Sequence, residues 1–234
     1  MSKQRVAIVT AAGRGIGAAC ARELADCGYH VVLMSRSDGA TALAKELGGV
    51  GVVGSVTEVS DLQRLVALTL EKHGRVDAVV NNTGAAPKGP LLEIDDDDWH
   101  AGLDLLVLNV ARMARLVTPV MAKQGGGALV NISTLGAEEP DDRFPVSSTL
   151  RAALSAYTKL YADRYATAGI RMNNILPGFV DSYEVDEETR LEIPMQRTGT
   201  VTELAKTAAF LLSSDSGFIT GQNIRVDGGL GRSL

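Results

Sequence analysis

Residues 6–17 read VAIVTAAGRGIG, an apolar run that leads into a glycine-rich turn. The β-branched run predicts a strand over Arg5–Thr10, and apolar residues on one face predict a helix over Ile16–Cys27. Glycine between them lets the backbone approach a pyrophosphate and lets the helix pack closely on the strand. The free N–H groups and the dipole at the helix start favour an anion. The stretch therefore predicts dinucleotide binding, with a purely structural turn as the alternative.

The rest of the chain alternates strands and helices. Apolar runs predict six further strands, at residues 30–34, 50–53, 76–80, 128–132, 170–176 and 223–226. Periodic apolar residues predict helices at residues 40–47, 62–70, 97–123, 147–168 and 201–213. Strands that are almost wholly apolar are typical of a parallel sheet covered by helices on both faces. Because no internal repeat or linker is found, residues 1–234 are expected to form a single α/β domain with a doubly wound parallel sheet.

Composition and charge exclude several classes of protein. The 234 residues are 45% hydrophobic and 22% charged, which excludes a disordered chain and a small disulfide scaffold. The net charge of −5 argues against nucleic-acid and anionic-membrane partners. We find no signal peptide, no run of ~20 apolar residues for a membrane span, and no metal-ligand spacing among the three histidines. Cys20 and Cys27 would lie too far apart on one helix for a disulfide, so a cytoplasmic protein is expected.

The end of the second strand bears on the choice of dinucleotide. An acidic residue there would bind the ribose 2′-hydroxyl of NAD(H), but this chain has Ser35 and Arg36. Arg36, together with Arg14 of the glycine-rich turn, could pair with a 2′-phosphate. The sequence therefore favours NADP(H) over NAD(H), with the alternative that both arginines are only surface charges.

Motifs along nearly the whole chain resemble those of the short-chain dehydrogenases/reductases. They are T-x-x-x-G-x-G at residues 10–17, N-N-T-G at 81–84, Asn109, N-I-S at 131–133, P-G at 177–178 and the tail at 221–229. The resemblance implies a Rossmann-like, seven-stranded parallel sheet in three α/β/α layers and a homotetramer or homodimer. It also implies that NAD(H) or NADP(H) is used to interconvert small alcohols and carbonyl compounds.

The resemblance also implies roles for individual residues. Asn109 would help to hold a proton-relay water, and Ser133 would hydrogen-bond the substrate oxygen. A substrate lid is expected at residues 181–197. The residues expected to bind the cofactor are Thr10, Gly13, Arg14, Gly15, Ile16, Gly17, Ser35, Arg36, Ser55, Val56, Asn81, Asn82, Gly84, Pro177, Gly178 and Val180.

The chain departs from the family pattern at the residues that carry the chemistry. Ser147 and Arg151 occupy the positions of the catalytic tyrosine and lysine, and no Tyr-x-x-x-Lys exists in the sequence. A serine hydroxyl is a far weaker acid than a tuned tyrosine. Arg151 could still bind ribose hydroxyls and steady an oxyanion. Two further departures are Ala11 for the first glycine of the turn, which we expect to be a mild change, and Ser55 for an acidic residue near the adenine.

Another group could supply the proton. Tyr157 lies ten residues beyond Ser147, about 15 Å along a helix, which is too far. Tyr183 of the lid could swing in. A carboxylic acid in the loop 138–143 could serve if burial raised its pKa, although a solvated acidic loop is the simpler interpretation.

Three hypotheses follow for the function. The first is an NAD(P)-dependent oxidoreductase acting on a carbonyl or alcohol, with catalytic residues Asn109, Ser133, Ser147 and Arg151 and an altered proton donor. The second is a catalytically inactive NADP-binding sensor or assembly partner. The third is a cofactor-bound enzyme of other chemistry, such as elimination or isomerisation. We favour the first, because the pyrophosphate turn and the strand-end residues persist.

Overall fold

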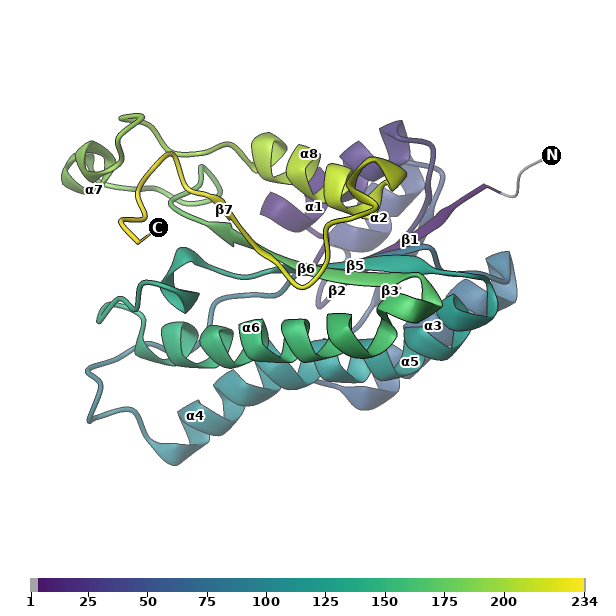
Figure 1. Cartoon of the computed structure of the whole chain (residues 1–234), viewed down its shortest axis with the longest axis horizontal. Helices are drawn as coiled ribbons and strands as arrows, with labels where there is room; N and C mark the ends of the chain where they lie inside the picture. The colour runs from purple at the N-terminus through teal and green to yellow at the C-terminus, as the bar shows by residue number, and fades with distance from the viewer. Residues whose placement is uncertain (1–3, 234) are drawn as a thin grey trace.

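Seven parallel strands form one sheet at the centre of the molecule, which we describe from a computed structural model covering residues 4–233 (Figure 1). The strand order is β3-β2-β1-β4-β5-β6-β7, and every neighbouring pair is parallel. This is the Rossmann-like, single-domain α/β fold that the sequence predicts. The strands are β1 (Val6–Thr10), β2 (His30–Ser35), β3 (Val50–Val53), β4 (Ala78–Asn81), β5 (Gly127–Ile132), β6 (Ile170–Pro177) and β7 (Asn223–Val226).

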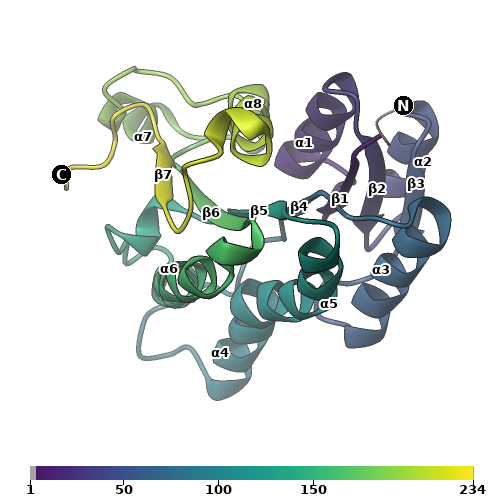
Figure 2. The same cartoon turned by 45° about the vertical axis from the view of Figure 1, so that its right-hand side comes forward.

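Helices cover both faces of the sheet, as the turned view in Figure 2 shows. One face carries α1 (Gly15–Asp26), α2 (Gly39–Glu46) and α8 (Val201–Leu212). The other face carries α3 (Val59–His73), α5 (Asn109–Lys123) and α6 (Pro145–Tyr165). Two shorter helices, α4 (Asp96–Leu103) and α7 (Glu187–Glu192), precede α5 and α8 respectively.

The apolar character of the strands follows from these two helical layers. In β1, Ala7 and Val9 belong to the core under α1 and α8, whereas Val6 and Ile8 belong to the core under α3 and α5. Successive side chains of a strand point to opposite faces, so both sets are removed from water. Fully burying a side chain the size of valine or isoleucine contributes about 1.5–3 kcal/mol.

A ladder of asparagine side chains crosses the last four strands. Asn81, Asn131, Asn174 and Asn223 occupy matching register positions on β4, β5, β6 and β7. The Asn81 amide donates to Asn131 Oδ1 at 2.8 Å, Asn131 donates to Asn174 Oδ1 at 2.9 Å, and Asn174 donates to Asn223 Oδ1 at 2.8 Å. Thr158 of α6 donates to the same oxygen of Asn174 at 2.9 Å. These contacts satisfy buried amides, which would otherwise oppose folding.

The predicted helix at residues 97–123 is a continuous helical run, but it is not a regular α-helix. A π-helical turn over Asp104–Leu108 separates α4 from α5. The run is also apolar enough to correct the expectation that no segment has the hydropathy of a membrane span. Asp96–Lys123 comprises 28 residues with a mean hydropathy of 1.5 in its most apolar window, of which 44% is buried inside the protein. Its apolar residues Val110, Met113 and Val117 are fully buried in the core beneath the sheet.

Several other element boundaries differ from those that the sequence predicts, and one helix was not predicted. Strand β4 starts at Ala78 because the backbone of Val76 is hydrogen-bonded by the Gln124 side chain, through both its N–H and its carbonyl. Helix α6 starts at Pro145, where the fixed φ of proline suits a first helical position. Helix α7 was not predicted; Asp186 caps it by accepting from the Thr189 N–H at 2.8 Å.

The chain reverses its winding direction between β1 and β4, which are neighbours in the sheet. In open α/β sheets a crevice forms at such a point, beside the carboxyl ends of the strands. The glycine-rich turn after β1 and the N-N-T-G segment after β4 both lie there.

Candidate active site and cofactor cleft

The glycine-rich turn leaves the first backbone amides of α1 free. Arg14 occupies the cap position in an extended conformation and provides no side-chain hydrogen bond, and no acidic residue lies in the first turn. Gly15 has φ +57°, a conformation that favours glycine. A Cβ on Gly17 would lie 2.4 Å from the carbonyl oxygen of Ala11, so no side chain fits there. The turn therefore offers unpaired N–H groups and a close approach to an anion.

The replacement of the first glycine is less mild than the sequence suggests. Ala11 adopts φ +46°, in the left-handed region where an L-residue is strained. The family glycine would hold this conformation without a Cβ penalty. The substitution therefore keeps the shape of the turn but costs conformational energy.

Thr10 and Asn82 join the turn to the end of β4. The Thr10 hydroxyl donates to the Asn82 carbonyl oxygen at 2.7 Å and accepts from the Asn82 N–H at 3.0 Å. The Asn82 side-chain amide donates to the Ala11 carbonyl oxygen at 3.3 Å. The two residues hold the glycine-rich turn against β4. They would therefore affect a ligand indirectly, by positioning the backbone of the turn.

Two arginines flank the cleft without partners. Arg14 and Arg36 are exposed, and within residues 4–233 neither forms an ion pair or a side-chain hydrogen bond. The Ser35 hydroxyl donates to the Ser37 carbonyl oxygen at 2.6 Å and accepts from the Ala40 N–H at 3.0 Å, so it shapes the loop after β2. A Cβ on Gly13 would lie 3.0 Å from that hydroxyl, which places the glycine-rich turn directly against the loop.

The remaining adenosine-side residues lie after β3 and β4. The Ser55 N–H donates to Asp61 Oδ2 at 2.9 Å, and the Ser55 hydroxyl lies 2.8 Å from Thr57 Oγ1. Val56 is buried and Gly84 is exposed. The sequence did not single out Thr83, the residue that departs from the family's N-N-A-G, and its hydroxyl is buried with no hydrogen-bond partner among the described residues.

The segment after β6 reaches back to the glycine-rich turn. The Gly178 N–H donates to the Val226 carbonyl oxygen at 3.2 Å, and buried Val180 pairs with Gly199 in an isolated parallel bridge. A Cβ on Gly15 would lie 3.5 Å from Cβ of Ser182. Pro177, Gly178 and Val180 thus connect the cleft at α1 with the start of the predicted lid.

Of the predicted catalytic residues, Ser133 has an unsatisfied hydroxyl. Ser133 follows β5 and is 7% exposed, yet its Oγ has no hydrogen-bond partner in the part of the chain that the structure describes. An unpaired buried hydroxyl is costly, so its persistence at a strand end points to a ligand group that completes it. The adjacent residue, Thr134, lines a cavity.

Ser147 and Arg151 lie one turn apart on α6 but face different surroundings. Ser147 lines the same cavity as Thr134. Arg151 is buried, and its guanidinium donates to the carbonyl oxygen of Ile132, beside Ser133. Burial lowers the pKa of Arg151 to about 10, which leaves it a cation at neutral pH.

Asn109 lies at the junction of the π-helical turn and α5. Its side chain is buried and donates to the carbonyl oxygen of Leu105, four residues earlier. Turns of this kind often mark functional positions, because they release backbone groups from the regular helical pattern. The π-helical turn packs against α6, the helix that carries Ser147 and Arg151.

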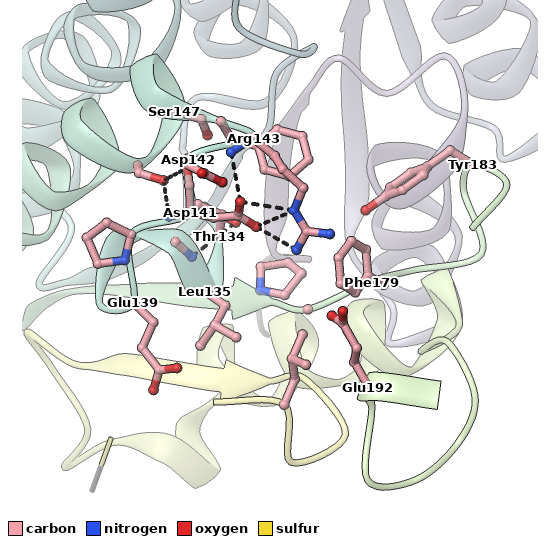
Figure 3. A pocket seen from close by; sticks show the side chains of 17 residues that line it. Thr134, Leu135, Glu139, Asp141, Asp142, Arg143, Ser147, Phe179, Tyr183 and Glu192 are labelled. Atoms are coloured by element: carbon pink, nitrogen blue, oxygen red, sulfur yellow. Dashed lines mark hydrogen bonds and ion pairs between the residues drawn. The ribbon is translucent and has the colours of Figure 1, made fainter. Parts of the chain in front are cut away.

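The cavity has a volume of about 650 Å³ and opens between the loop 134–144, the start of α6 and the segment 177–183 (Figure 3). Arg143 lies in its wall and is held by Asp141, with guanidinium–carboxylate distances of 2.8–3.0 Å. The Arg143 guanidinium lies 5.6 Å from the centre of the Phe179 ring. Glu192 of α7 and Tyr183 complete this side of the wall.

The alternative proton donors are poorly suited to the task. Partial burial of Asp141 opposes the effect of Arg143, but the hydrogen bonds from Arg143 prevail and lower the Asp141 pKa. Hydrogen bonds from Ser233 and the Arg232 N–H lower the pKa of Glu139. Partial desolvation raises the pKa of the exposed Tyr183 phenol, against the opposing charge of Arg143, which makes it a weaker acid than a free tyrosine. The carboxyl groups are therefore ionised at neutral pH, contrary to the idea that burial turns one into a proton donor.

Residues of the cleft fit a nicotinamide dinucleotide. The unpaired amides of α1 suit the pyrophosphate, and Pro177 and Gly178 line the cavity beyond. The unsatisfied hydroxyls of Thr83 and Ser133 lie at the ends of β4 and β5, at the same crevice.

Comparisons with known proteins place this architecture in a class. Residues 10–231 match a family profile described as enoyl-(acyl carrier protein) reductase. Dehydrogenase/reductase SDR family member 4 of Homo sapiens is 34% identical over 241 residues, covering 96% of this chain and 87% of that relative. Oxidoreductase UcpA of Salmonella typhimurium is 32% identical over 246 residues, covering 96% of this chain and 94% of that relative.

Solved structures agree with the sequence relatives. Acetoin dehydrogenase from Enterobacter cloacae superimposes with a TM-score of 0.91 and 29% identity, covering 98% of this chain and 96% of the other. YwfH, an NADPH-dependent reductase involved in bacilysin biosynthesis, superimposes with a TM-score of 0.94 and 25% identity, covering 99% and 100%. The fold and the site thus define an oxidoreductase with a Rossmann-like domain. The chain belongs to the short-chain dehydrogenase/reductase family, as its motifs predict.

Proposed function

We propose that this chain is an NADP(H)-dependent oxidoreductase that moves hydride between the nicotinamide and a small carbonyl or alcohol substrate. The proposal rests on two adjoining features. The free N–H groups at the start of α1 are flanked by Arg14 and Arg36. The segment with Pro177 and Gly178 connects them to a cavity that Ser147 lines. When bound, the cofactor would supply the hydride donor or acceptor.

The preference for NADP(H) rests on charge. Arg14 and Arg36 remain unpaired within residues 4–233, and Ser35 stands where a carboxylate would repel a 2′-phosphate. A guanidinium presents several donors to a phosphate and stays charged at neutral pH. The remaining proposed cofactor residues, at the glycine-rich turn and after β3 and β4, act mainly through backbone groups.

The residues of the site would orient the substrate, but none of those named here is a good proton donor. The unsatisfied hydroxyl of Ser133 is free to hydrogen-bond a substrate atom. Arg151 provides a fixed positive charge behind β5, and Asn109 steadies the adjoining helix. Ser147 lines the cavity but is a weak acid, so the proton donor differs from that of the family.

Residues 181–197 are proposed as a substrate lid within a domain that spans residues 1–234. Tyr183 and Glu192, both in this segment, line the cavity, and both are exposed. A cytoplasmic location and a homodimer or homotetramer are further proposals, for which the family likeness is the support. Size-exclusion chromatography with light scattering tests the oligomeric state.

Calorimetry and a reduction screen test the proposal. NADPH is expected to bind the protein more tightly than NADH, and NADPH oxidation is expected with at least one member of a panel of small ketones and aldehydes. Tight binding of NADPH with no oxidation of it across the panel would contradict the proposal, because the site would then hold the cofactor without using it.

A further inference from the structure

The wall of the cavity carries an excess of negative charge. Its charged residues are four carboxylates, Glu139, Asp141, Asp142 and Glu192, and one guanidinium, Arg143. Two further cations lie outside the lining: Arg225, whose guanidinium is 4.0 Å from the Glu139 carboxylate, and Lys88, whose ammonium is 4.5 Å from the centre of the Phe144 ring. The cavity is thus better matched to a cation than to an anion.

Internal pairing does not remove this excess. Glu139 accepts from the backbone N–H groups of Arg232 and Ser233 and lies 4.0 Å from the Arg225 guanidinium, and Asp141 is bound to Arg143. Asp142 and Glu192 are exposed and have no ion pair or side-chain hydrogen bond within residues 4–233. Two carboxylates therefore line the cavity without an ion pair of their own.

The proton donor is the second feature that distinguishes this cavity. Reduction of a ketone creates an alkoxide, which needs a proton from a positioned acid. Ser147 is too weak an acid, Asp141 and Glu139 are ionised because of their hydrogen bonds, and partial desolvation of the exposed Tyr183 raises its pKa. The wall suits an acceptor that needs no proton at the moment of reduction.

We propose that the preferred acceptor of this site is an iminium ion, a protonated or alkylated imine, which is reduced to an amine. The proposal rests on the hydride transfer proposed above. The iminium carbon accepts the hydride from NADPH and forms a new C–H bond. The π pair of the C=N bond moves onto nitrogen, which loses its positive charge, and NADPH is oxidised to NADP⁺. This reaction requires no proton donor, so it can proceed with Ser147 in the position of the family's catalytic tyrosine.

Different residues would attract the positive charge of this cation and hydrogen-bond its N–H group. Asp142 and Glu192 attract the positive charge, and neither forms an ion pair or side-chain hydrogen bond with another group within residues 4–233. The hydroxyl of Ser147, which lines the cavity, can accept a hydrogen bond from an iminium N–H. Arg151 contributes no group to the cavity lining, because its guanidinium is buried against the Ile132 carbonyl.

Three probes of one shape test the proposal. They are 2-methyl-1-pyrroline, its permanently charged 1,2-dimethyl-1-pyrrolinium salt, and the neutral 2-methylcyclopentanone. We expect kcat/KM for both nitrogen compounds to exceed that for the ketone at least about 100-fold, as an acceptor needing no general acid predicts. The rate with 2-methyl-1-pyrroline should fall as the pH rises through the pKa of the imine, whereas the rate with the permanent cation should not follow that titration.

Charge-removing variants provide a second readout. Asp142→Asn with Glu192→Gln is expected to lower kcat/KM for the permanent cation about tenfold, the effect of losing about 1.4 kcal/mol of attraction, and thereby to lower the ratio of kcat/KM for the cation to that for the ketone. Calorimetry without turnover should show weaker binding of the cationic product 2-methylpyrrolidine to the same variant. Glu192→Gln alone has Glu188→Gln as its matched control, which removes an equal charge from α7 outside the cavity lining.

The outcomes separate this proposal from the function on which it rests. Reduction of the ketone as efficiently as the two nitrogen compounds, or no loss in the double variant, would overturn the iminium proposal and leave hydride transfer standing. If NADPH binds but none of the three probes or the carbonyl panel is reduced, hydride transfer itself fails, and the iminium proposal fails with it.

Discussion

The guanidinium of Arg151 donates a hydrogen bond to the carbonyl oxygen of Ile132, the last residue of β5. A permanent charge is thereby buried directly behind Ser133. Within residues 4–233 no carboxylate pairs with it, so the charge is held by its position on α6 and by a backbone oxygen alone. Such an arrangement disfavours stability and is typical of residues kept for function.

Replacing Arg151 by methionine should stabilise the fold and impair activity. Burial lowers the pKa of Arg151 to about 10, so the folded chain holds the proton less tightly than the unfolded chain. The charge therefore costs stability at every pH below about 10, and this cost falls as the pH rises above 10. We expect Arg151→Met to raise the free energy of unfolding by about 1–2 kcal/mol in urea titrations at pH 7. A lower free energy of unfolding with unchanged NADPH turnover would contradict this.

Restoring the family pair should restore a proton donor. Ser147→Tyr combined with Arg151→Lys is expected to raise kcat/KM for ketone reduction about 100-fold, the usual contribution of a positioned general acid. The rate with a permanently cationic iminium should not rise, because that reaction needs no proton. A well-folded double variant that binds NADPH and shows no gain with ketones would argue against our placement of Ser147 and Arg151.

The two unpaired arginines should decide the choice of dinucleotide. Arg14→Ala and Arg36→Ala are each expected to weaken NADPH binding about 10- to 100-fold in calorimetry, since each removes charged hydrogen bonds to the 2′-phosphate. Binding of NADH should change little. Arg22→Ala provides the control, because Arg22 is an exposed arginine of α1 that pairs with Glu46 on α2. An equal loss for both dinucleotides would show that the arginines do not contact the 2′-phosphate.

The strain at Ala11 should be removable. Ala11→Gly is expected to raise the free energy of unfolding by about 0.5–1 kcal/mol, because relief of the left-handed conformation exceeds the added freedom of the unfolded chain. Gly17→Ala should act in the opposite direction, since its Cβ would press on the Ala11 carbonyl oxygen. Denaturation curves in urea measure both. Destabilisation by Ala11→Gly would mean that the turn is not strained at this residue.

The fold was predictable because its signals are local. Apolar runs such as Val6–Val9 identify buried parallel strands, and the G-x-G turn identifies the first strand–helix junction. Boundaries were missed where distant side chains decide them. The Gln124 side chain hydrogen-bonds the backbone of Val76, 48 residues away in the sequence, and no local sequence pattern indicates this contact.

The sequence indicated candidate site residues and an acidic loop beside them, but not how the charged groups pair. Motif spacing brings out Ser133, Ser147 and Arg151, although their roles stay predictions. The approach of Glu192 to the cavity depends on how α7 folds, and the pairing of Asp141 with Arg143 depends on the loop conformation. No repeating pattern in the sequence predicts either contact.

The asparagine ladder has a consequence for the outermost strand. Strand β7 ends the sheet, and peeling it away would leave the Asn174 amide without the Asn223 oxygen that it bonds at 2.8 Å. Asn223 in turn donates to Glu138 at 2.9 Å, in the loop that leads to the cavity. Fraying at this border would therefore disturb both the sheet interior and the cavity rim, so β7 should exchange its amide hydrogens as slowly as an inner strand.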